Sequence, residues 1–371
     1  MKTTLLGGLT HTAFLRKHWQ KKPLLIRNAI PQFEGLLDKN KLISLSYNED
    51  VQSRLVMSNK KEWQLLNGPF APRDFKKISG NWTLLVQGIN YFLPSAARLL
   101  KSFNFIPHAR LDDLMVSYAP DGGGVGPHFD SYDVFLLQGF GKRLWQISKQ
   151  EDRSLVPDAP LRILKKFVPE EEWLLEAGDM LYLPPNYAHN GIAVGESMTY
   201  SIGFRALSHQ EIVREFLHYL EDHYDLDGIY TDPDLMLTKH PAEISPLMIK
   251  KVASVLKKIR FNEKEMSDFL GKYLSEPKQN LYFDAPHAPL TKSQFLQQAK
   301  KKGICLDLKS QMLFTKATLY INGEATKFHP ESKALLKQLA NQREVILNTS
   351  DAATRDLLYG WYLDGYLDLM A

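Results

Sequence analysis

Three side chains with the chemistry of metal ligands lie in two short segments of the chain. His128 and Asp130 follow a glycine-rich run at residues 122–126, and His189 comes about sixty residues later. Alternate residues of an extended segment leave the backbone on the same side, so His128 and Asp130 can reach one ion. Two imidazoles and one carboxylate hold non-haem Fe(II) on one face and leave other positions open. The sequence therefore predicts a metal site made of His128, Asp130 and His189.

The segment that ends at His189 supports this prediction. It reads as a turn at residues 177–179, a strand at 180–183, a corner at Pro184 and Pro185, and then the ligand. This spacing matches the second half of a cupin metal motif. Asn186 stands where glycine is usual, and asparagine is the residue that next best tolerates a left-handed backbone. A histidine two residues before an aspartate is common in loops, so the prediction depends on this second segment.

An iron site of this kind suits a 2-oxoacid that chelates the metal, together with O₂. The distal carboxylate of such a cosubstrate needs a cation inside the barrel. Arg143 is the best candidate, because it shares a strand face with Trp145 and Ile147. Ser117 could add a hydroxyl group. The alternative is that Arg143 is a solvated strand residue beside Lys142.

Strands must position these residues. In the predicted strand 112–118, Asp113, Met115 and Ser117 point to one side, and Leu114, Val116 and Tyr118 to the other. We expect a hairpin of residues 132–139 and 142–147 around the turn 139–141, and further strands at 172–175, 180–183 and 198–204. Many short strands separated by turns predict an α+β protein whose centre is a double-stranded β-helix, the jelly-roll barrel of cupins.

The chain is expected to contain three parts. Residues 1–206 form the catalytic barrel with its flanking elements, including a helix at 12–19 and strands at 23–27 and 82–88. Residues 207–285 form a helical segment that begins behind Ser208 as N-cap and could be a dimerisation unit. Residues 286–371 combine helices with a hairpin at the Asn322-Gly323 turn, which suggests a winged-helix-like domain.

Composition bounds the class of protein. The 371 residues are 44% hydrophobic, enough for a substantial core, and the formal net charge of +4 permits a nucleic-acid partner without arguing for one. Cys305 is the single cysteine, which excludes an intrachain disulfide framework and fits a reducing compartment. No apolar stretch has the length of a signal peptide core or a membrane span. We expect a cytoplasmic protein with no membrane contact.

Beyond these residues, the sequence resembles a known family, the bacterial ribosomal oxygenases, which are Jumonji-C-type 2-oxoglutarate oxygenases. The resemblance rests on several motifs between Lys22 and Ala206, and the rest of the chain agrees only in its expected layout. The motifs are Lys22–Arg27, Asp112–Met115, Gly122–Phe135, Gln138–Gly139, Arg143–Trp145, Gly178–Pro185 and Tyr200–Ala206.

The resemblance implies hydroxylation of a protein, at the β-carbon of an arginine in large-subunit ribosomal protein sixteen, with Fe(II), 2-oxoglutarate and O₂. It makes His128, Asp130 and His189 the iron ligands, and Arg143 with Ser117 the 2-oxoglutarate site. It assigns the substrate pocket to Asp113, Met115, Tyr132 and Ser201. An acidic group with a methionine and a tyrosine suits an arginine side chain. Met115 and Tyr132 could instead be ordinary core residues, and Asp113 a solvated strand end.

Two other classes of function remain open. A cupin-type metalloenzyme with another divalent metal would share the ligands but would not use 2-oxoglutarate. A non-enzymatic module that binds ribosomes or nucleic acid would use the tail and the lysine clusters at 250–251, 257–258 and 300–302. Such clusters are more often solvated helix faces, so direct nucleic-acid binding stays uncertain.

Overall fold

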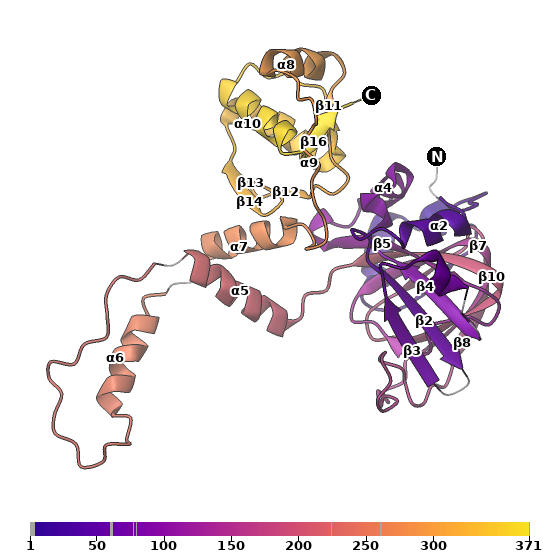
Figure 1. Cartoon of the computed structure of the whole chain (residues 1–371), viewed down its shortest axis with the longest axis horizontal. Coiled ribbons are helices and arrows are strands. Elements are labelled where there is room, and N and C mark those ends of the chain that lie inside the picture. Colours follow the sequence, from indigo (N-terminus) through magenta and orange to yellow (C-terminus); the bar gives the residue numbers. More distant parts are fainter. Residues whose placement is uncertain are drawn as a thin grey trace.

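The computed structural model describes residues 4–59, 62–76, 78, 80–223, 225–259 and 262–370. Figure 1 shows a strand-rich body made by the first two hundred residues, a helical arm that extends away from it, and a C-terminal unit beside the body. The predicted mixture of helix and sheet is confirmed. None of the described helices combines the length and the apolar character needed to cross a membrane.

One ten-stranded antiparallel sheet curls around the centre of the body. Its main path runs β1-β9-β7-β10-β5-β4-β2-β3, with β6 paired to β10 and β8 paired to β7. Strands that lie far apart in sequence are therefore neighbours in space. The strands are β1 (Leu24–Ile26), β2 (Ser53–Asn59), β3 (Glu62–Asn67), β4 (Asn81–Val86), β5 (Leu111–Ala119), β6 (His128–Phe129), β7 (Asp133–Ser148), β8 (Glu171–Glu176), β9 (Met180–Leu183) and β10 (Ala188–Phe204).

The hairpin predicted around residues 139–141 is wrong. β7 runs unbroken through these residues, and both of its halves pair with β10, which begins at Ala188 instead of 198. The register shifts between Val194 and Thr199, where the two strands bend together. Gly139 and Gly141 lie where the neighbouring backbone or the ring of Tyr200 leaves no room for a Cβ atom. These glycines therefore permit close strand approach at a bend rather than a chain reversal.

The core of the body fills one face of the sheet and is covered by helices. Leu114, Val116 and Tyr118 are buried in it, on the side predicted from the alternation of β5. A smaller apolar cluster, which includes Val134, Leu136 and Ile147, lies elsewhere on the sheet. The helical elements of the body are α1 (His11–Lys17), α2 (Lys39–Leu45), α3 (Pro72–Phe75), α4 (Pro94–Lys101) and the 3₁₀ turns η1 (Thr4–Leu6), η2 (Ile89–Tyr91) and η3 (His108–Arg110).

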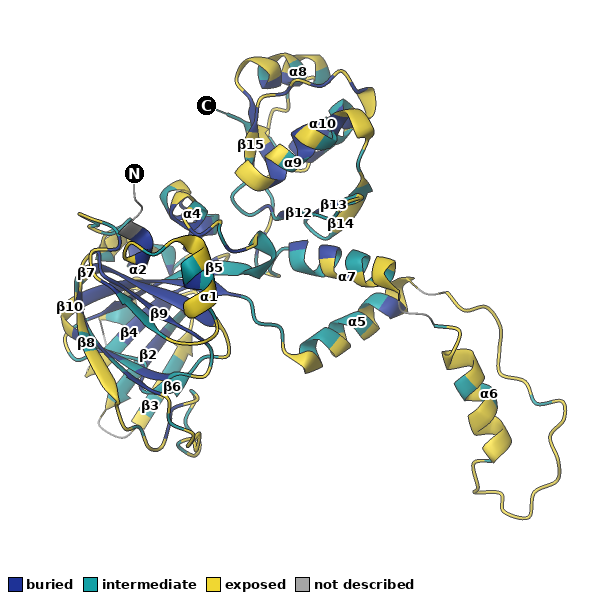
Figure 2. Ribbon diagram, turned by 180° about the vertical axis from the view of Figure 1, so that it is seen from behind, coloured by how far each residue is buried: buried dark blue, intermediate teal, exposed yellow. Residues whose placement is uncertain are grey.

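The arm consists of α5 (His209–His223), α6 (Pro246–Leu256) and α7 (Glu263–Ser275). The predicted cap of α5 is confirmed, because Ser208 Oγ accepts a hydrogen bond of 3.0 Å from the Glu211 backbone N–H. α6 contains no buried residue, and Figure 2 shows it mostly exposed, at the far end of the arm. An isolated helix of this length is marginal in water, and α6 gains no stability from burial within this chain.

The C-terminal unit has its own buried core and two small sheets, ordered β15-β11-β16 and β12-β13-β14. Asn322 (φ 50°) and Gly323 (φ 88°) form the predicted tight turn between β13 and β14. α7 packs on β13 at Gly271, so the arm and this unit are joined. The elements are α8 (Lys292–Lys301), β11 (Ile304–Leu306), β12 (Met312–Phe314), β13 (Thr318–Ile321), β14 (Glu324–Lys327), η4 (Pro330–Ser332), α9 (Lys333–Gln342), β15 (Glu344–Val345), α10 (Ala352–Leu363) and β16 (Leu367–Leu369).

Candidate active site

The three predicted metal ligands meet at one end of the barrel. β6 pairs antiparallel with β10, and this register places His128 directly opposite His189. Directly opposed side chains leave a sheet on the same face, and the two imidazole centroids are 4.2 Å apart. Asp130 completes the group, with carboxylate oxygens 3.8 Å from His128 Nε2 and 3.6 Å from His189 Nε2. The ligand atoms of the three residues lie within 4.8 Å of one another, close enough to hold one ion.

Backbone contacts orient both imidazoles toward the ion position. His128 Nδ1 lies 2.9 Å from the carbonyl oxygen of Gly126, and His189 Nδ1 lies 3.0 Å from that of Tyr187. A carbonyl only accepts, so each Nδ1 carries the proton and each Nε2 is free to bind a metal. Burial, and then the nearby His128, lower the pKa of His189 to about 4. His189 is therefore a neutral imidazole at neutral pH, as a metal ligand must be.

The loop before His128 depends on its glycines for space. A Cβ atom at Gly124 would lie 2.6 Å from the carbonyl oxygen of Gly191, so only glycine lets this loop approach β10. On the other side of the site, Asn186 has φ 68°, the left-handed conformation predicted for it, and its N–H donates to the carbonyl oxygen of Asp130. Both ligand-bearing segments are thus fixed by backbone geometry.

Arg143 lies inside the same cavity and is almost completely buried, with 2% of its surface exposed. Its Nη2 donates to the carbonyl oxygen of Gly191 at 3.1 Å, and its guanidinium packs 5.3 Å from the ring centroid of Trp145. Within the described part of the chain, Nε and Nη1 are buried without a hydrogen-bond partner. This burial lowers the pKa of Arg143 to about 10. The solvated alternative considered above does not fit these contacts.

The polar face of β5 forms the opposite wall. Asp113, Met115 and Ser117 all line the cavity, as their alternation along the strand predicts. Ser201 on β10 lies directly opposite Met115, and Tyr132 adds a ring at the mouth with 38% of its surface exposed. The cavity measures about 320 Å³. It therefore contains all nine residues singled out from the sequence, the three predicted ligands among them.

Several lining residues were missed in the sequence. Arg54 and Gln87 come from the β2 and β4 region and reach the cavity wall; β2 itself was not predicted. Arg162 belongs to the loop between β7 and β8, which lies against the cavity without a recognisable motif. Trp145 was noted only as a neighbour of Arg143, yet its Nε1 is buried without a partner among the described residues. A strand signal at 53–59 would have been needed to find Arg54.

The donor set fits iron and a 2-oxo dicarboxylate. Two imidazoles and one carboxylate, with open space on the cavity side, suit Fe(II) chelated by a 2-oxoacid. A buried guanidinium with two unpartnered nitrogen atoms is costly unless an anion reaches it, and a distal carboxylate has the matching charge and geometry. The hydroxyl of Ser117, which donates to the Thr199 carbonyl oxygen at 3.4 Å, lies on the same cavity wall.

Comparisons with known families agree with this site. A model described as JmjC domain matches residues 98–212, and a model described as ROXA-like winged helix matches residues 258–368. The first match contains all three metal ligands, Arg143 and the β5 wall. The second confirms the predicted winged-helix character of the C-terminal unit, and it begins before α7, which packs on that unit.

Individual relatives extend the likeness over most of the chain. The chain is 32% identical over 331 residues to a ribosomal protein uL16 3-hydroxylase of Escherichia coli (strain K12), covering 88% of each. It is 38% identical over 242 residues to a probable ribosomal oxygenase of Haemophilus influenzae, covering 62% of this chain and 56% of that protein. A solved structure of YcfD, a ribosomal oxygenase from Escherichia coli in complex with cobalt and 2-oxoglutarate, matches with a TM-score of 0.83 and 30% identity over 98% of this chain and 99% of that one.

The identity and coverage of these relatives, together with a ligand triad and a buried cation in one barrel, settle the family. They also confirm the barrel as a JmjC cupin-type fold with a C-terminal winged helix. The chain belongs to the JmjC-domain ribosomal oxygenases, enzymes that use Fe(II), 2-oxoglutarate and O₂.

Proposed function

We propose that this enzyme hydroxylates an arginine side chain of ribosomal protein uL16, the large-subunit ribosomal protein sixteen. The observation that carries the proposal is the composition of one cavity. It holds a metal triad and a buried guanidinium, two of whose nitrogen atoms have no hydrogen-bond partner among the described residues, and a buried carboxylate, Asp113, on the β5 wall. The relative with 32% identity is a uL16 3-hydroxylase, which supports the same substrate protein.

Each residue has a distinct role in this proposal. His128 and His189 would bind the iron through Nε2, and Asp130 through a carboxylate oxygen. Arg143 and Ser117 hold the distal carboxylate of 2-oxoglutarate, whose charge offsets the buried guanidinium. The Arg143–Trp145 pair and the apolar side chains of Val134 and Leu136 exclude water from this end of the cavity.

Four residues form the pocket for the substrate side chain. Asp113 receives its guanidinium, Met115 and Tyr132 flank its alkyl stem, and Ser201 lies opposite Met115 on the neighbouring strand. Burial and the nearby carboxylate of Asp130 raise the pKa of Tyr132, so the phenol stays neutral and can donate a hydrogen bond. Bound iron with 2-oxoglutarate supplies the oxidation, in which one oxygen atom of O₂ enters the substrate and succinate and CO₂ are released.

Mass spectrometry of uL16 tests this function. Purified enzyme, Fe(II) and 2-oxoglutarate should add one oxygen atom to uL16 at a single arginine, with one succinate formed per modified residue. His128→Ala should abolish both products because it removes a metal ligand, whereas His240→Ala, an exposed histidine of the arm, should retain them. Succinate without modified uL16 would reject the substrate, and an absence of both with the native protein would favour a cupin enzyme of different chemistry.

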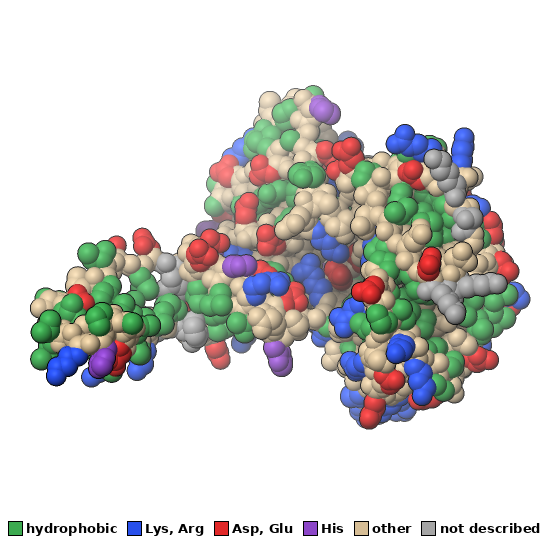
Figure 3. Space-filling model, turned by 60° about the horizontal axis from the view of Figure 1, so that its bottom comes forward, with side chains coloured by type: hydrophobic (Ala, Val, Ile, Leu, Met, Phe, Trp, Pro, Cys, Tyr) green, Lys and Arg blue, Asp and Glu red, His purple; other side chains and the backbone are tan. Residues whose placement is uncertain are grey.

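We further propose that the protein is a homodimer formed through the arm. Apolar side chains of α5 and α6 are exposed, among them Leu217 (58%), Leu256 (60%) and Ile249 (58%). Figure 3 shows hydrophobic side chains gathered on the arm, away from the body. A second copy can cover both arms in one two-fold contact. A cytoplasmic location is also proposed, because a ribosomal substrate and a free Cys305 fit a reducing compartment.

A further inference from the structure

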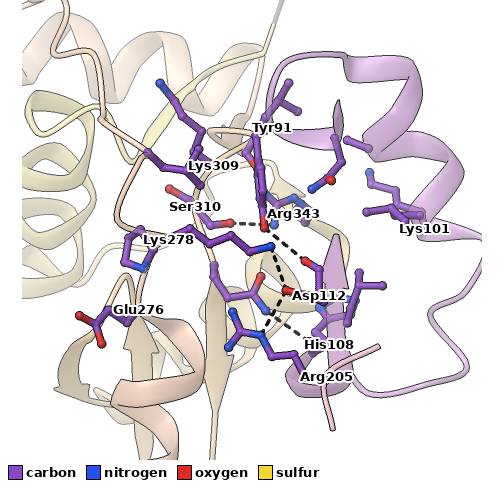
Figure 4. Close-up of a pocket in the computed structure, with 18 of the residues that line it drawn as sticks. Tyr91, Lys101, His108, Asp112, Arg205, Glu276, Lys278, Lys309, Ser310 and Arg343 are labelled. Atoms are coloured by element: carbon purple, nitrogen blue, oxygen red, sulfur yellow. Dashed lines mark hydrogen bonds and ion pairs between the residues drawn. The ribbon is translucent and has the colours of Figure 1, made fainter. Parts of the chain in front are cut away.

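The segment that follows α7 lies against the catalytic body. Arg205 Nη1, at the end of β10, donates to the carbonyl oxygen of Leu274 at 3.3 Å. Asn280 Nδ2 donates to the carbonyl oxygen of Asp50 at 2.6 Å. Between these two contacts, the side chain of Lys278 enters the junction between the body and the C-terminal unit (Figure 4). The segment is therefore docked on both sides of Lys278.

Lys278 makes its ion pairs with the two acidic residues at the start of β5. Its Nζ lies 3.0 Å from Asp112 Oδ1 and 3.2 Å from Asp113 Oδ2, and 5.9 Å from the ring centroid of Tyr91. Figure 4 shows Lys278 and Arg205 converging on Asp112 from different parts of the chain. The side chain of Asp113 is only 7% exposed and that of Lys278 only 24%, so water screens this pair weakly.

Asp113 lies between Lys278 and the catalytic cavity. Its Oδ2 is on the side of Lys278, whereas the residue also lines the catalytic cavity beside Met115, Tyr132 and Gly203. A Cβ atom at Gly203 would lie 4.0 Å from Asp113 Oδ1, which places this second oxygen near the cavity wall. A carboxylate can accept several hydrogen bonds, so the contact with Lys278 leaves acceptor capacity for a ligand in the cavity.

The charges around Asp113 decide whether it is ionised. Burial raises the pKa of Asp113 above its ordinary value even with Lys278 in place. Lys278 opposes this rise through its charge and its hydrogen bond, as does a backbone hydrogen bond from Gly88, whereas the adjacent Asp112 adds to it. Arg205 lies 3.7 Å from Asp112, and the neutral phenols of Tyr91 and Tyr132 complete the titratable surroundings. Without Lys278, Arg205 would still pair with Asp112, whereas Asp113 would keep only its backbone hydrogen bond from Gly88. A protonated Asp113 would bind a guanidinium poorly.

We propose that Lys278 is a positioning residue for substrate, which holds Asp113 as an oriented carboxylate so that its cavity-facing oxygen can receive the guanidinium of the substrate arginine. This inference rests on the proposed function. It makes the substrate half of the site dependent on the segment that leads into the C-terminal unit, while the metal and 2-oxoglutarate half is complete within the barrel. Lys278 lies 165 residues from Asp113 in the sequence.

Steady-state kinetics with uL16 test the proposal. Lys278→Met should raise the KM for uL16 by about tenfold or more, because the carboxylate loses its partner. Succinate formation without uL16 should stay at the native level, since the metal half is untouched. Lys278→Arg should restore most of the affinity. Lys309→Met is the matched control, because Lys309 lies in the same junction but bonds to Tyr282 and Asp284 instead.

The pH profile separates a charge effect from loss of structure. As the pH falls, the KM for uL16 should begin to rise at a higher pH in Lys278→Met than in the native protein, because loss of Lys278 raises the pKa of Asp113 further. An unchanged KM in Lys278→Met, or an equal rise in Lys309→Met, would overturn the proposal. A lower KM in Lys278→Met would also overturn it, by showing that Lys278 competes with substrate.

One measurement tests the effect of Lys278 on Asp113 even if the proposed function is wrong. If the native enzyme forms succinate but leaves uL16 unmodified, the substrate assignment is wrong. The carboxyl carbon of Asp113 can still be titrated by carbon-13 NMR, with Asp113→Asn identifying its signal. A higher pKa of Asp113 in Lys278→Met than in the native protein is expected, and equal values in the two proteins would remove the role given to Lys278.

Discussion

Arg143 is a charged residue enclosed where water cannot compensate it. Two of its nitrogen atoms lack a hydrogen-bond partner among the described residues, and its pKa is lowered to about 10 by burial alone. Such a group destabilises the protein until an anion binds. In the proposed function this anion is the distal carboxylate of 2-oxoglutarate, so binding of the cosubstrate should offset the cost in folding free energy.

Replacing Arg143 by methionine should move stability and activity in opposite directions. Arg143→Met should raise the melting temperature of the enzyme without ligands, because an apolar side chain of comparable size replaces a buried charge that has no anion beside it. The expected gain in the free energy of unfolding is about 1 kcal/mol or more. It should raise the KM for 2-oxoglutarate by about a hundredfold. With Mn²⁺ present in both samples, added 2-oxoglutarate should raise the melting temperature of the native protein much more than that of the variant. A variant that binds 2-oxoglutarate normally would exclude this role for Arg143.

At the level of single residues, the sequence identifies those that share a motif or a strand face. His128, Asp130 and His189 stand in recognisable segments, and the alternation of β5 places Asp113, Met115 and Ser117 correctly. Lys278 and Arg54 carry no such signal. Lys278 reaches Asp113 only because of how the segment after α7 docks, and docking geometry is not encoded in local spacing.

At the level of secondary structure, two long strands, β7 and β10, organise the site. Glycines at 139 and 141 look like turn residues, because a turn and a tight bend between strands both need glycine. The choice between them depends on which strand is the partner, and both halves of β7 pair with β10. Local sequence therefore found the strand segments but not their continuity, and β2 was missed altogether.

Gly191 on β10 offers a test of this strand pair. A Cβ atom there would lie 2.6 Å from Arg143 Nε and 2.8 Å from the Trp145 ring. Gly191→Ala should therefore displace the guanidinium, raise the KM for 2-oxoglutarate, and cost about 1 to 3 kcal/mol of stability. Gly360→Ala in α10 is the control, because no atom lies within 4 Å of its Cβ position and alanine favours the helix. Kinetics and thermal unfolding of both variants measure the difference, and an equal 2-oxoglutarate KM in the two would contradict the packing argument.

Over the whole molecule, the arm is notable for its exposed apolar side chains. α6 has no buried residue, and its side chains Met248, Val252 and Val255 are each between 41% and 44% exposed. Helical periodicity predicts which face is apolar, but it does not identify what covers that face. The domain limits at 206 and 285 also stay a prediction.

A charge on the apolar face of α6 should separate the proposed dimer. Val252→Glu places a carboxylate where a second copy would pack, so light scattering should change from the mass of two chains to that of one at micromolar concentration. Lys250→Glu, an exposed position on the same helix, is the control and should leave the dimer intact. A native protein that is already a single chain would reject the proposal.

The pairing of β7 with β10 also fixes the distance between the metal ligand His189 and the cation Arg143. His189 pairs with Ile147, and Ala193 pairs with Arg143, so the metal ligand and the cation lie four residues apart on one continuous run of backbone hydrogen bonds. That separation, about 13 Å between the paired positions, is set by the rise per residue of a strand and does not adjust to the molecule that enters. With Arg143 as the proposed carboxylate site, a 2-oxo diacid one carbon shorter or longer than 2-oxoglutarate should therefore fit the iron and the guanidinium less well at the same time.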